Sequence, residues 1–169
     1  MINMTPLEIK NIKDQIQRIL HAPGNYMGGN LEFAIVFDYH IDKKSLVDFT
    51  KELIKILKST DKIFINARLN IIKWISDEKL IKEVSSMGVL QIGRGFEDYE
   101  WGSTDKTYDS LTGQLKKFYA RSKLIILITD NAYVINDIQT INENLNPFLH
   151  RKLMKIDIST IQASETKQE

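Results

Sequence analysis

The chain has 169 residues, a length that predicts one domain. Hydrophobic residues make up 43% and charged residues 27%, which excludes disordered, collagen-like and low-complexity proteins. Lys and Arg total 23 against 22 for Asp and Glu, so the composition shows no basic excess of the kind that nucleic-acid binders carry. Because the chain has no cysteine, disulfides, thiolate nucleophiles and Cys-ligated zinc are also excluded.

Residues Thr5–His21 are predicted to form a helix. Thr5 is a suitable N-cap, Pro6 stands at the first helical position, and Glu8 follows at capping-box spacing. A glycine-rich loop comes next, so residues 1–30 are expected to be an N-terminal helix and loop appended to the main domain. The first residues are too polar for a secretory signal, and no apolar run is long enough to span a bilayer. We therefore expect a cytoplasmic protein without a membrane partner.

The rest of the chain alternates between apolar strand-like segments and amphipathic helices. Strands are predicted at Leu31–Phe37, Ile63–Ile75 (one strand or two), Val89–Ile92, Leu124–Thr129 and Lys152–Ile158. Helices are predicted at Lys43–Leu57, Glu78–Ser85, Thr107–Ala120 and Asp137–Leu145. This alternation predicts an α/β fold with a largely parallel sheet over residues 31–160. The polar residues 161–169 are expected to be a flexible tail.

Acidic residues follow the two most apolar predicted strands. Asp38 and Asp42 come after the first strand, and Asp130 ends the later segment LIILITD. In parallel sheets ligands bind beyond the carboxyl ends of the strands, so these residues mark the candidate site. Three neighbouring carboxylates repel one another unless a cation lies between them. Oxygen ligands of this kind suit Mg²⁺, Mn²⁺ or Ca²⁺.

This order of residues resembles the von Willebrand factor A-type domain. That family has a metal-ion-dependent adhesion site, with Asp-x-Ser-x-Ser after the first strand, a later Thr turn, and an Asp closing the fourth strand. Asp38 matches the first Asp, Gly102-Ser103-Thr104 the Thr turn, and Asp130 the closing Asp. The resemblance covers about residues 31–158 and implies a three-layer, doubly wound, Rossmann-like sheet. It also implies a divalent cation, Mg²⁺ or Mn²⁺, bound by Asp38, His40, Asp42, Thr104 and Asp130.

The sequence departs from the family pattern at three positions. His40 and Asp42 replace the two serines, and Asn131 stands where the family usually has Gly. Asp42 adds a negative charge, which strengthens cation binding and weakens recruitment of an acidic partner. His40 favours Zn²⁺ or Mn²⁺ over Mg²⁺.

Each predicted ligand also has a purely structural interpretation. His40 could be a solvated loop histidine, and Asp42 could be the N-cap of the next helix. Thr104 could cap a helix beginning near Asp105, and Asp130 could form an Asx turn.

Two functional hypotheses follow. The first is a non-catalytic protein-interaction module with a degenerate adhesion site, which binds a protein partner through the strand-end loops, with or without a cation. The second is a metal-dependent phosphoesterase or nuclease, in which Asp38, Asp42 and Asp130 hold metal and His40 is the general base. The first is favoured, because the net charge gives no sign of a nucleic-acid channel, no further acidic motif completes a two-metal site, and no serine nucleophile elbow occurs. The aromatic loop Gly93–Asp105 is expected either to bind a partner or to cover the sheet.

Overall fold

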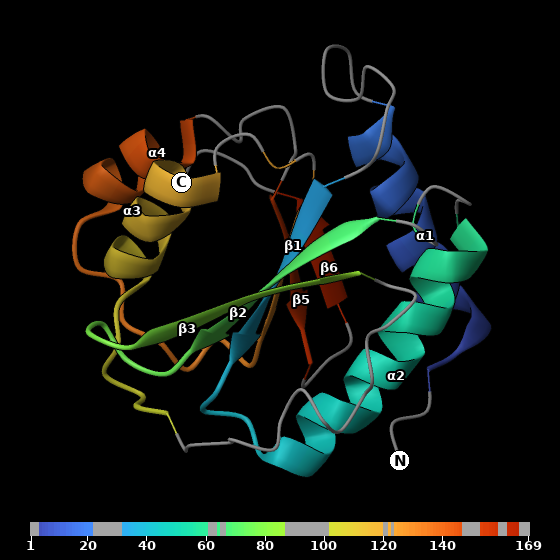
Figure 1. The fold of residues 1–169 in the computed structure, drawn as a ribbon, viewed down its shortest axis with the longest axis horizontal. Coiled ribbons are helices and arrows are strands. Elements are labelled where there is room, and N and C mark those ends of the chain that lie inside the picture. The colour runs from blue at the N-terminus through green and yellow to red at the C-terminus, as the bar shows by residue number, and fades with distance from the viewer. Residues whose placement is uncertain are drawn as a thin grey trace.

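Helices cover both faces of a mixed sheet (Figure 1). The structure is a computed structural model that describes residues 4–21, 32–60, 64, 67–86, 102–119, 122, 124–146, 153–158 and 162–165. The helices in these ranges are α1 (Pro6–Leu20), α2 (Lys43–Thr60), α3 (Tyr108–Tyr119) and α4 (Ile138–Leu145). The strands in the same ranges are β1 (Glu32–Asp38), β2 (Arg68–Trp74), β3 (Leu80–Ser86), β4 (Ile125–Thr129), β5 (Leu153–Asp157) and β6 (Gln162–Glu165).

The sheet is mostly parallel, as the alternating sequence pattern predicts. Its strand order over the described residues is β3-β2-β1-β4-β5-β6. The central pairs β1/β2, β1/β4 and β4/β5 are parallel, whereas the edge strands β3 and β6 run antiparallel to their neighbours. The α/β class is therefore confirmed.

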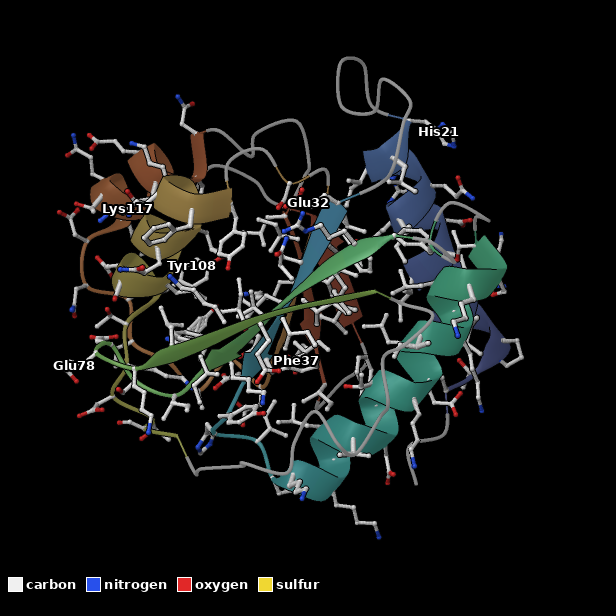
Figure 2. The ribbon with its side chains drawn as sticks, in the orientation of Figure 1. His21, Glu32, Phe37, Glu78, Tyr108 and Lys117 are labelled. Carbon is white, nitrogen blue, oxygen red and sulfur yellow. The ribbon has the colours of Figure 1, made fainter. Side chains whose placement is uncertain are left out.

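The alternation of side chains along β1 explains the two helical layers. Phe33 and Phe37 point to one face of the sheet and pack in the core shared with α1 and α2. Ala34 and Val36 point to the other face and pack in the core shared with α3 and α4. Phe37 and Tyr108 accordingly lie on opposite sides of the sheet (Figure 2).

Helix α1 belongs to the first of these layers. Its N-terminus has the expected capping box, in which the Thr5 hydroxyl accepts from the Glu8 backbone N–H at 3.2 Å and the Glu8 carboxylate accepts from the Thr5 N–H at 2.8 Å. Ile12, Ile16 and Ile19 are buried in the same core as the sheet and α2. Where the sequence suggested an appendage, α1 instead contributes to the common core.

Two segments differ from the sequence predictions. Glu78–Ser85 was expected to be helical, but Leu80–Ser86 forms β3, paired along its whole length with β2. A two-turn helix is marginal in isolation, and pairing with a buried strand supplies the hydrogen bonds that decide the outcome. The expected flexible tail contains β6, at residues 162–165. The predicted strand Val89–Ile92 and most of the aromatic loop lie outside the described residues.

The topology sets the carboxyl ends of β1 and β4 apart from the other strand ends. Helix α2 follows β1 on one face of the sheet, and α4 follows β4 on the other face (Figure 1). Because the chain leaves these adjacent parallel strands in opposite directions, their carboxyl ends form a topological switch point, where doubly wound sheets bind ligands. Asp38 and Asp130 are brought to this point.

Candidate functional site

Asp38 is the last residue of β1 and is fully buried at the switch point. Its Oδ2 accepts a hydrogen bond from the hydroxyl of Thr129 at 2.7 Å, and its Oδ1 accepts one from the backbone N–H of His40 at 3.2 Å. Oδ1 also forms an ion pair with the ammonium of Lys106, whose side chain is fully buried. The carboxylate therefore has a positive partner from within the chain.

Lys106 reaches Asp38 from the segment before α3. Its Nζ also donates to the backbone carbonyl of Trp74 at 2.9 Å and lies 4.5 Å from the centre of the Trp74 ring. Burial lowers the pKa of Lys106, while the carboxylates of Asp38, Asp130 and Asp77 oppose this shift by favouring the ammonium. A neutral amine beside an ionised Asp38 would leave the buried carboxylate without a counter-ion.

Gly102 allows the segment before α3 to cross the ends of two strands. The N–H of Gly102 donates to the carbonyl of Tyr39 at 2.7 Å, and the N–H of Ser103 donates to the carbonyl of Ile75 at 2.9 Å. A Cβ at position 102 would lie 2.9 Å from the oxygen of Ile75, closer than a methyl group can approach. Only glycine permits this contact, which positions the chain so that Lys106 meets Asp38.

Asp42 is the N-cap of α2. Its Oδ2 accepts from the backbone N–H of Ser45 at 2.9 Å, and its Oδ1 accepts from the Ser45 hydroxyl at 2.8 Å. These hydrogen bonds lower the pKa of Asp42. The structural interpretation of Asp42 is thus confirmed, and both of its carboxylate oxygens contact the first turn of the helix.

Thr104 is exposed and is not a helix cap. Helix α3 begins at Tyr108, and the hydroxyl of Thr107 accepts from the backbone N–H of Ser110 at 3.1 Å. The interpretation of Thr104 as the helix cap was therefore wrong. Thr107, which directly precedes the first residue of α3, is the cap instead. Thr107 is itself held by Asp77, which accepts from its backbone N–H at 2.8 Å.

His40 and Asp130 face each other across the switch point. His40 Nε2 lies 3.3 Å from Asp130 Oδ2, and the two side chains are 24% and 27% exposed. Asp130 Oδ1 accepts from the N–H of Ala132 at 3.1 Å, so the expected Asx turn is present. Asn131 has a φ of 65°. Glycine and asparagine tolerate this left-handed conformation best.

The predicted ligands therefore do not converge on one point. Within the described ranges, no group of three His, Asp or Glu side chains is arranged to hold a metal ion. Asp38 contacts an ammonium, and Asp42 contacts Ser45. In this arrangement the residues do not fit a divalent ion bound to Asp38, because such an ion would lie beside the positive charge of Lys106.

The loop between β4 and α4 is fixed by backbone hydrogen bonds. The N–H of Val134 donates to the carbonyl of Lys106 at 3.0 Å, and the N–H of Tyr108 donates to the carbonyl of Val134 at 2.9 Å. The carboxylate of Asp109 accepts from the N–H groups of Asn136 at 3.0 Å and Asp137 at 2.8 Å. The loop thus has a defined conformation with these backbone groups paired.

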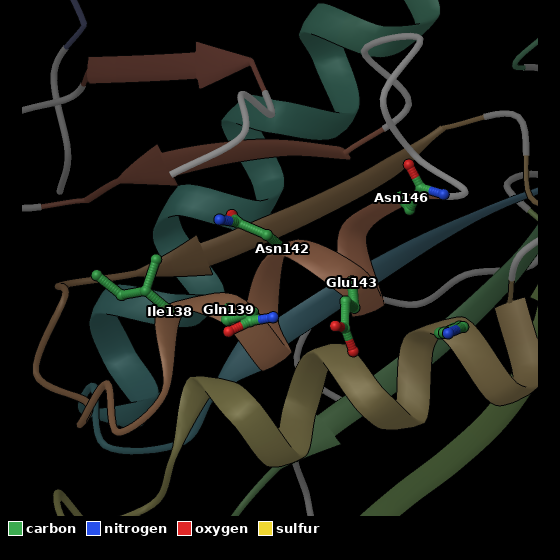
Figure 3. A pocket seen from close by; sticks show the side chains of 6 residues that line it. Ile138, Gln139, Asn142, Glu143 and Asn146 are labelled. Carbon is green, nitrogen blue, oxygen red and sulfur yellow. The ribbon is translucent and has the colours of Figure 1, made fainter.

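This fixed loop and the first residue of α4 expose apolar side chains. Val134, Ile135 and Ile138 are 38%, 49% and 50% exposed, although all three are large hydrophobic residues. We call these three residues the apolar edge patch. An open pocket of about 700 Å³ continues from Ile138 along α4, where it is lined by Gln139, Asn142, Glu143 and Asn146 and by Lys116 of α3 (Figure 3).

Sequence reasoning missed Lys106, Thr129 and the apolar edge patch. Nothing in the pattern separates Lys106 from a solvated lysine, because it lies in a polar segment with acidic neighbours. The pattern predicts Thr129 only as the end of a strand. The run Val134-Ile135 is apolar, but it lies within a predicted loop and so carries no periodic signal.

Comparison with protein-family models and with curated proteins finds no match to this chain. Among the helices described, none has both the length and the apolar character needed to cross a bilayer.

Proposed function

We propose that this chain is a non-catalytic protein-interaction module of the von Willebrand A type, and that its partner binds to the loops at the carboxyl edge of the sheet. The observation that carries the proposal is the apolar edge patch on a fixed loop. Exposed clusters of large apolar side chains are typical of interaction sites in soluble proteins. This cluster begins at Val134 in the loop that follows Asp130, at the edge where doubly wound sheets bind ligands.

The rigidity of the loop favours binding. Val134 exchanges backbone hydrogen bonds with Lys106 and Tyr108, and the N–H groups of Asn136 and Asp137 donate to the carboxylate of Asp109. A surface that is already ordered loses little conformational entropy when a partner binds, so more of the contact energy becomes affinity. Val134 and Ile135 would then act as preformed anchors rather than as residues that must fold onto the partner.

Charges around the patch suggest the chemistry of the partner. Asp109, Asp130 and Asp137 lie on or beside the same loop, and Asp109 and Asp137 accept hydrogen bonds without a described cationic partner. We therefore expect a protein surface that presents an apolar side chain flanked by Lys or Arg. Such complementarity would increase the association rate and the specificity more than the affinity.

Two features support the von Willebrand A type. Asp38 and Asp130 come from adjacent parallel strands, as the resemblance requires. Asn131 adopts a left-handed backbone conformation that suits Gly, the residue usual in that family.

The phosphoesterase alternative has less support. It requires Asp38, Asp42 and Asp130 to share metal ions, whereas Asp38 contacts Lys106 and Asp42 contacts Ser45. Turnover of a generic phosphodiester by the purified chain, lost in Asp130→Asn, would favour this alternative.

The interaction proposal can be tested by comparing captured proteins. Immobilised wild-type chain and the variants Ile135→Asp and Leu7→Asp would be exposed to the same lysate, and bound proteins would be quantified by mass spectrometry. Leu7 is a matched control, because it is an apolar side chain 67% exposed on α1. We expect a partner that binds wild type and Leu7→Asp but is reduced at least tenfold on Ile135→Asp. The partner would then be purified and its Kd measured by calorimetry for all three chains.

Equal capture by the three chains, or equal Kd values, would contradict the proposal that the carboxyl edge is the binding surface. Circular dichroism of each variant before the experiment ensures that a loss of binding does not reflect unfolding. Both substituted side chains are exposed, so neither change disturbs the core.

A further inference from the structure

The charge at Asp38 is balanced within the chain itself. Asp38 is fully buried, and an isolated carboxylate there would be strongly unfavourable. Its three described contacts are the Lys106 ammonium, the Thr129 hydroxyl and the His40 backbone N–H. All three are hydrogen-bond donors, so the carboxylate is satisfied without any external ion.

The Lys106 side chain, like the Asp38 carboxylate, is fixed by several contacts. Its side chain is fully buried, its Nζ donates to the Trp74 carbonyl at 2.9 Å, and the Trp74 ring lies 4.5 Å from it. Two neighbouring segments fix the backbone of this residue: its own carbonyl accepts from Val134, and Gly102 anchors the chain before it. Lys106 cannot reach solvent without breaking these contacts.

The position of the ammonium is the one a cation would take to neutralise Asp38. It also interacts favourably with Asp130 and Asp77, which follow β4 and β2. The ammonium thus contacts β2 through the Trp74 carbonyl and β1 through Asp38, and Asp38 in turn accepts a hydrogen bond from Thr129 of β4. A divalent ion at Asp38 would have to displace this charge or bind beside it.

We propose that Lys106 takes the place of a divalent cation at the carboxyl edge of the sheet. The edge is therefore ordered without a metal ion, and the edge also binds its partner without a metal ion. The statement about ordering concerns the chain alone, whereas the statement about the partner rests on the interaction function proposed above. The same lysine supports the loop of the apolar edge patch, because its carbonyl accepts from Val134.

The first test uses the wild-type chain. Chelator-treated protein would be titrated with Mg²⁺, Mn²⁺, Ca²⁺ and Zn²⁺ in turn, by calorimetry and by thermal unfolding. We expect no saturable heat at millimolar ion and an unchanged unfolding midpoint. Saturable binding that is lost in Asp38→Asn would overturn the inference. This result would leave the interaction proposal standing, since a partner could still bind to the same edge through the ion.

The second test uses the ion pair itself. Lys106→Met removes the charge and leaves Asp38 buried without a counter-ion, so we expect a large fall in the unfolding midpoint. The double variant Asp38→Asn/Lys106→Met should recover much of that fall, because both charges are then absent. Lys155→Met is the matched control, since Lys155 is a partly buried lysine of β5 whose Nζ donates to the Tyr133 hydroxyl at 3.1 Å.

An unchanged midpoint in Lys106→Met would overturn the inference, as would a double variant no more stable than the single one. If Lys106→Met does not fold, the double variant and the metal titration of the wild type still decide the question. Failure of the patch variants to affect a partner would count against the proposed function alone.

Discussion

At the scale of single residues, Gly102 is the described glycine whose surroundings leave no room for a side chain. A methyl group at this position would lie nearest to a backbone oxygen, that of Ile75, which belongs to the turn after β2 and cannot move aside as a side chain can. The segment carrying Lys106 must therefore shift if any side chain is introduced at position 102.

Gly102→Ala should lower the free energy of unfolding by about 1–3 kcal/mol, the usual range for overpacking a well-packed site. Gly113→Ala provides the control, because its Cβ would lie 3.6 Å from the Asn144 side chain, an ordinary contact, and Gly113 lies within α3. Replacing a helical glycine should stabilise the chain by up to about 1 kcal/mol. Urea unfolding of both variants would measure the difference. Equal stabilities would show that the close approach at Gly102 carries no energetic weight.

The sequence identified which residues reach the switch point but not how they pair there. Asp38 and Asp130 could be placed because a carboxylate after a buried parallel strand must lie at its carboxyl edge. The partner of Asp38 could not be predicted in this way. Lys106 is separated from Asp38 by 68 positions in the sequence, and their contact depends on the path of an irregular segment. Local patterns carry no information about such long-range pairing.

At the scale of elements, the cap of α2 contributes a pH-dependent part of the stability. The Ser45 hydrogen bonds lower the pKa of Asp42 below its ordinary value of 3.8. A carboxyl group whose pKa is lower in the folded state stabilises the fold above the unfolded pKa, and this stabilisation is lost as pH falls through the folded pKa. The cap is thus fully effective at neutral pH and fails in acid.

Asp42→Ala should lower the free energy of unfolding by about 1 kcal/mol at neutral pH, and the difference from wild type should shrink below pH 3.8. Asp42→Asn is the control, because asparagine also caps helices but does not titrate. Its stability should be close to that of wild type at pH 7. Urea unfolding at several pH values between 2.5 and 7, on the order of five points, would follow the difference. A constant difference across this range would contradict the role of the ionised cap.

Helices with clear caps and an apolar face were predictable, whereas the edge strands were not. Thr5, Pro6 and Glu8 mark the start of α1, and the structure shows the same capping box. Strand β3 contains residues of good helix propensity, such as Leu80, Lys82 and Glu83. Its pairing with β2 overrides that preference, and the sequence of β3 alone does not reveal the partner strand.

At the scale of the whole molecule, the two ends of the described chain lie against one another. Helix α1 packs against both α2 and β6, and β6 pairs with β5 to complete one edge of the sheet. The first helix and the last strand are therefore part of one cooperative structure with the central strands. The sequence predicts a polar tail here because three of the four residues of β6 are polar. Only the pairing with β5 defines this segment as a strand.

This arrangement makes the contribution of β6 measurable. A chain ending at residue 161 would expose the backbone edge of β5 and remove a contact of α1. We expect its thermal midpoint to fall by several degrees, since each 1 kcal/mol corresponds to about 2–4 °C for a chain of this size. A chain ending at residue 165 retains all of β6 and should unfold with the wild-type midpoint. If both shortened chains unfolded at the wild-type temperature, β6 would contribute nothing to stability and the sheet would effectively end at β5.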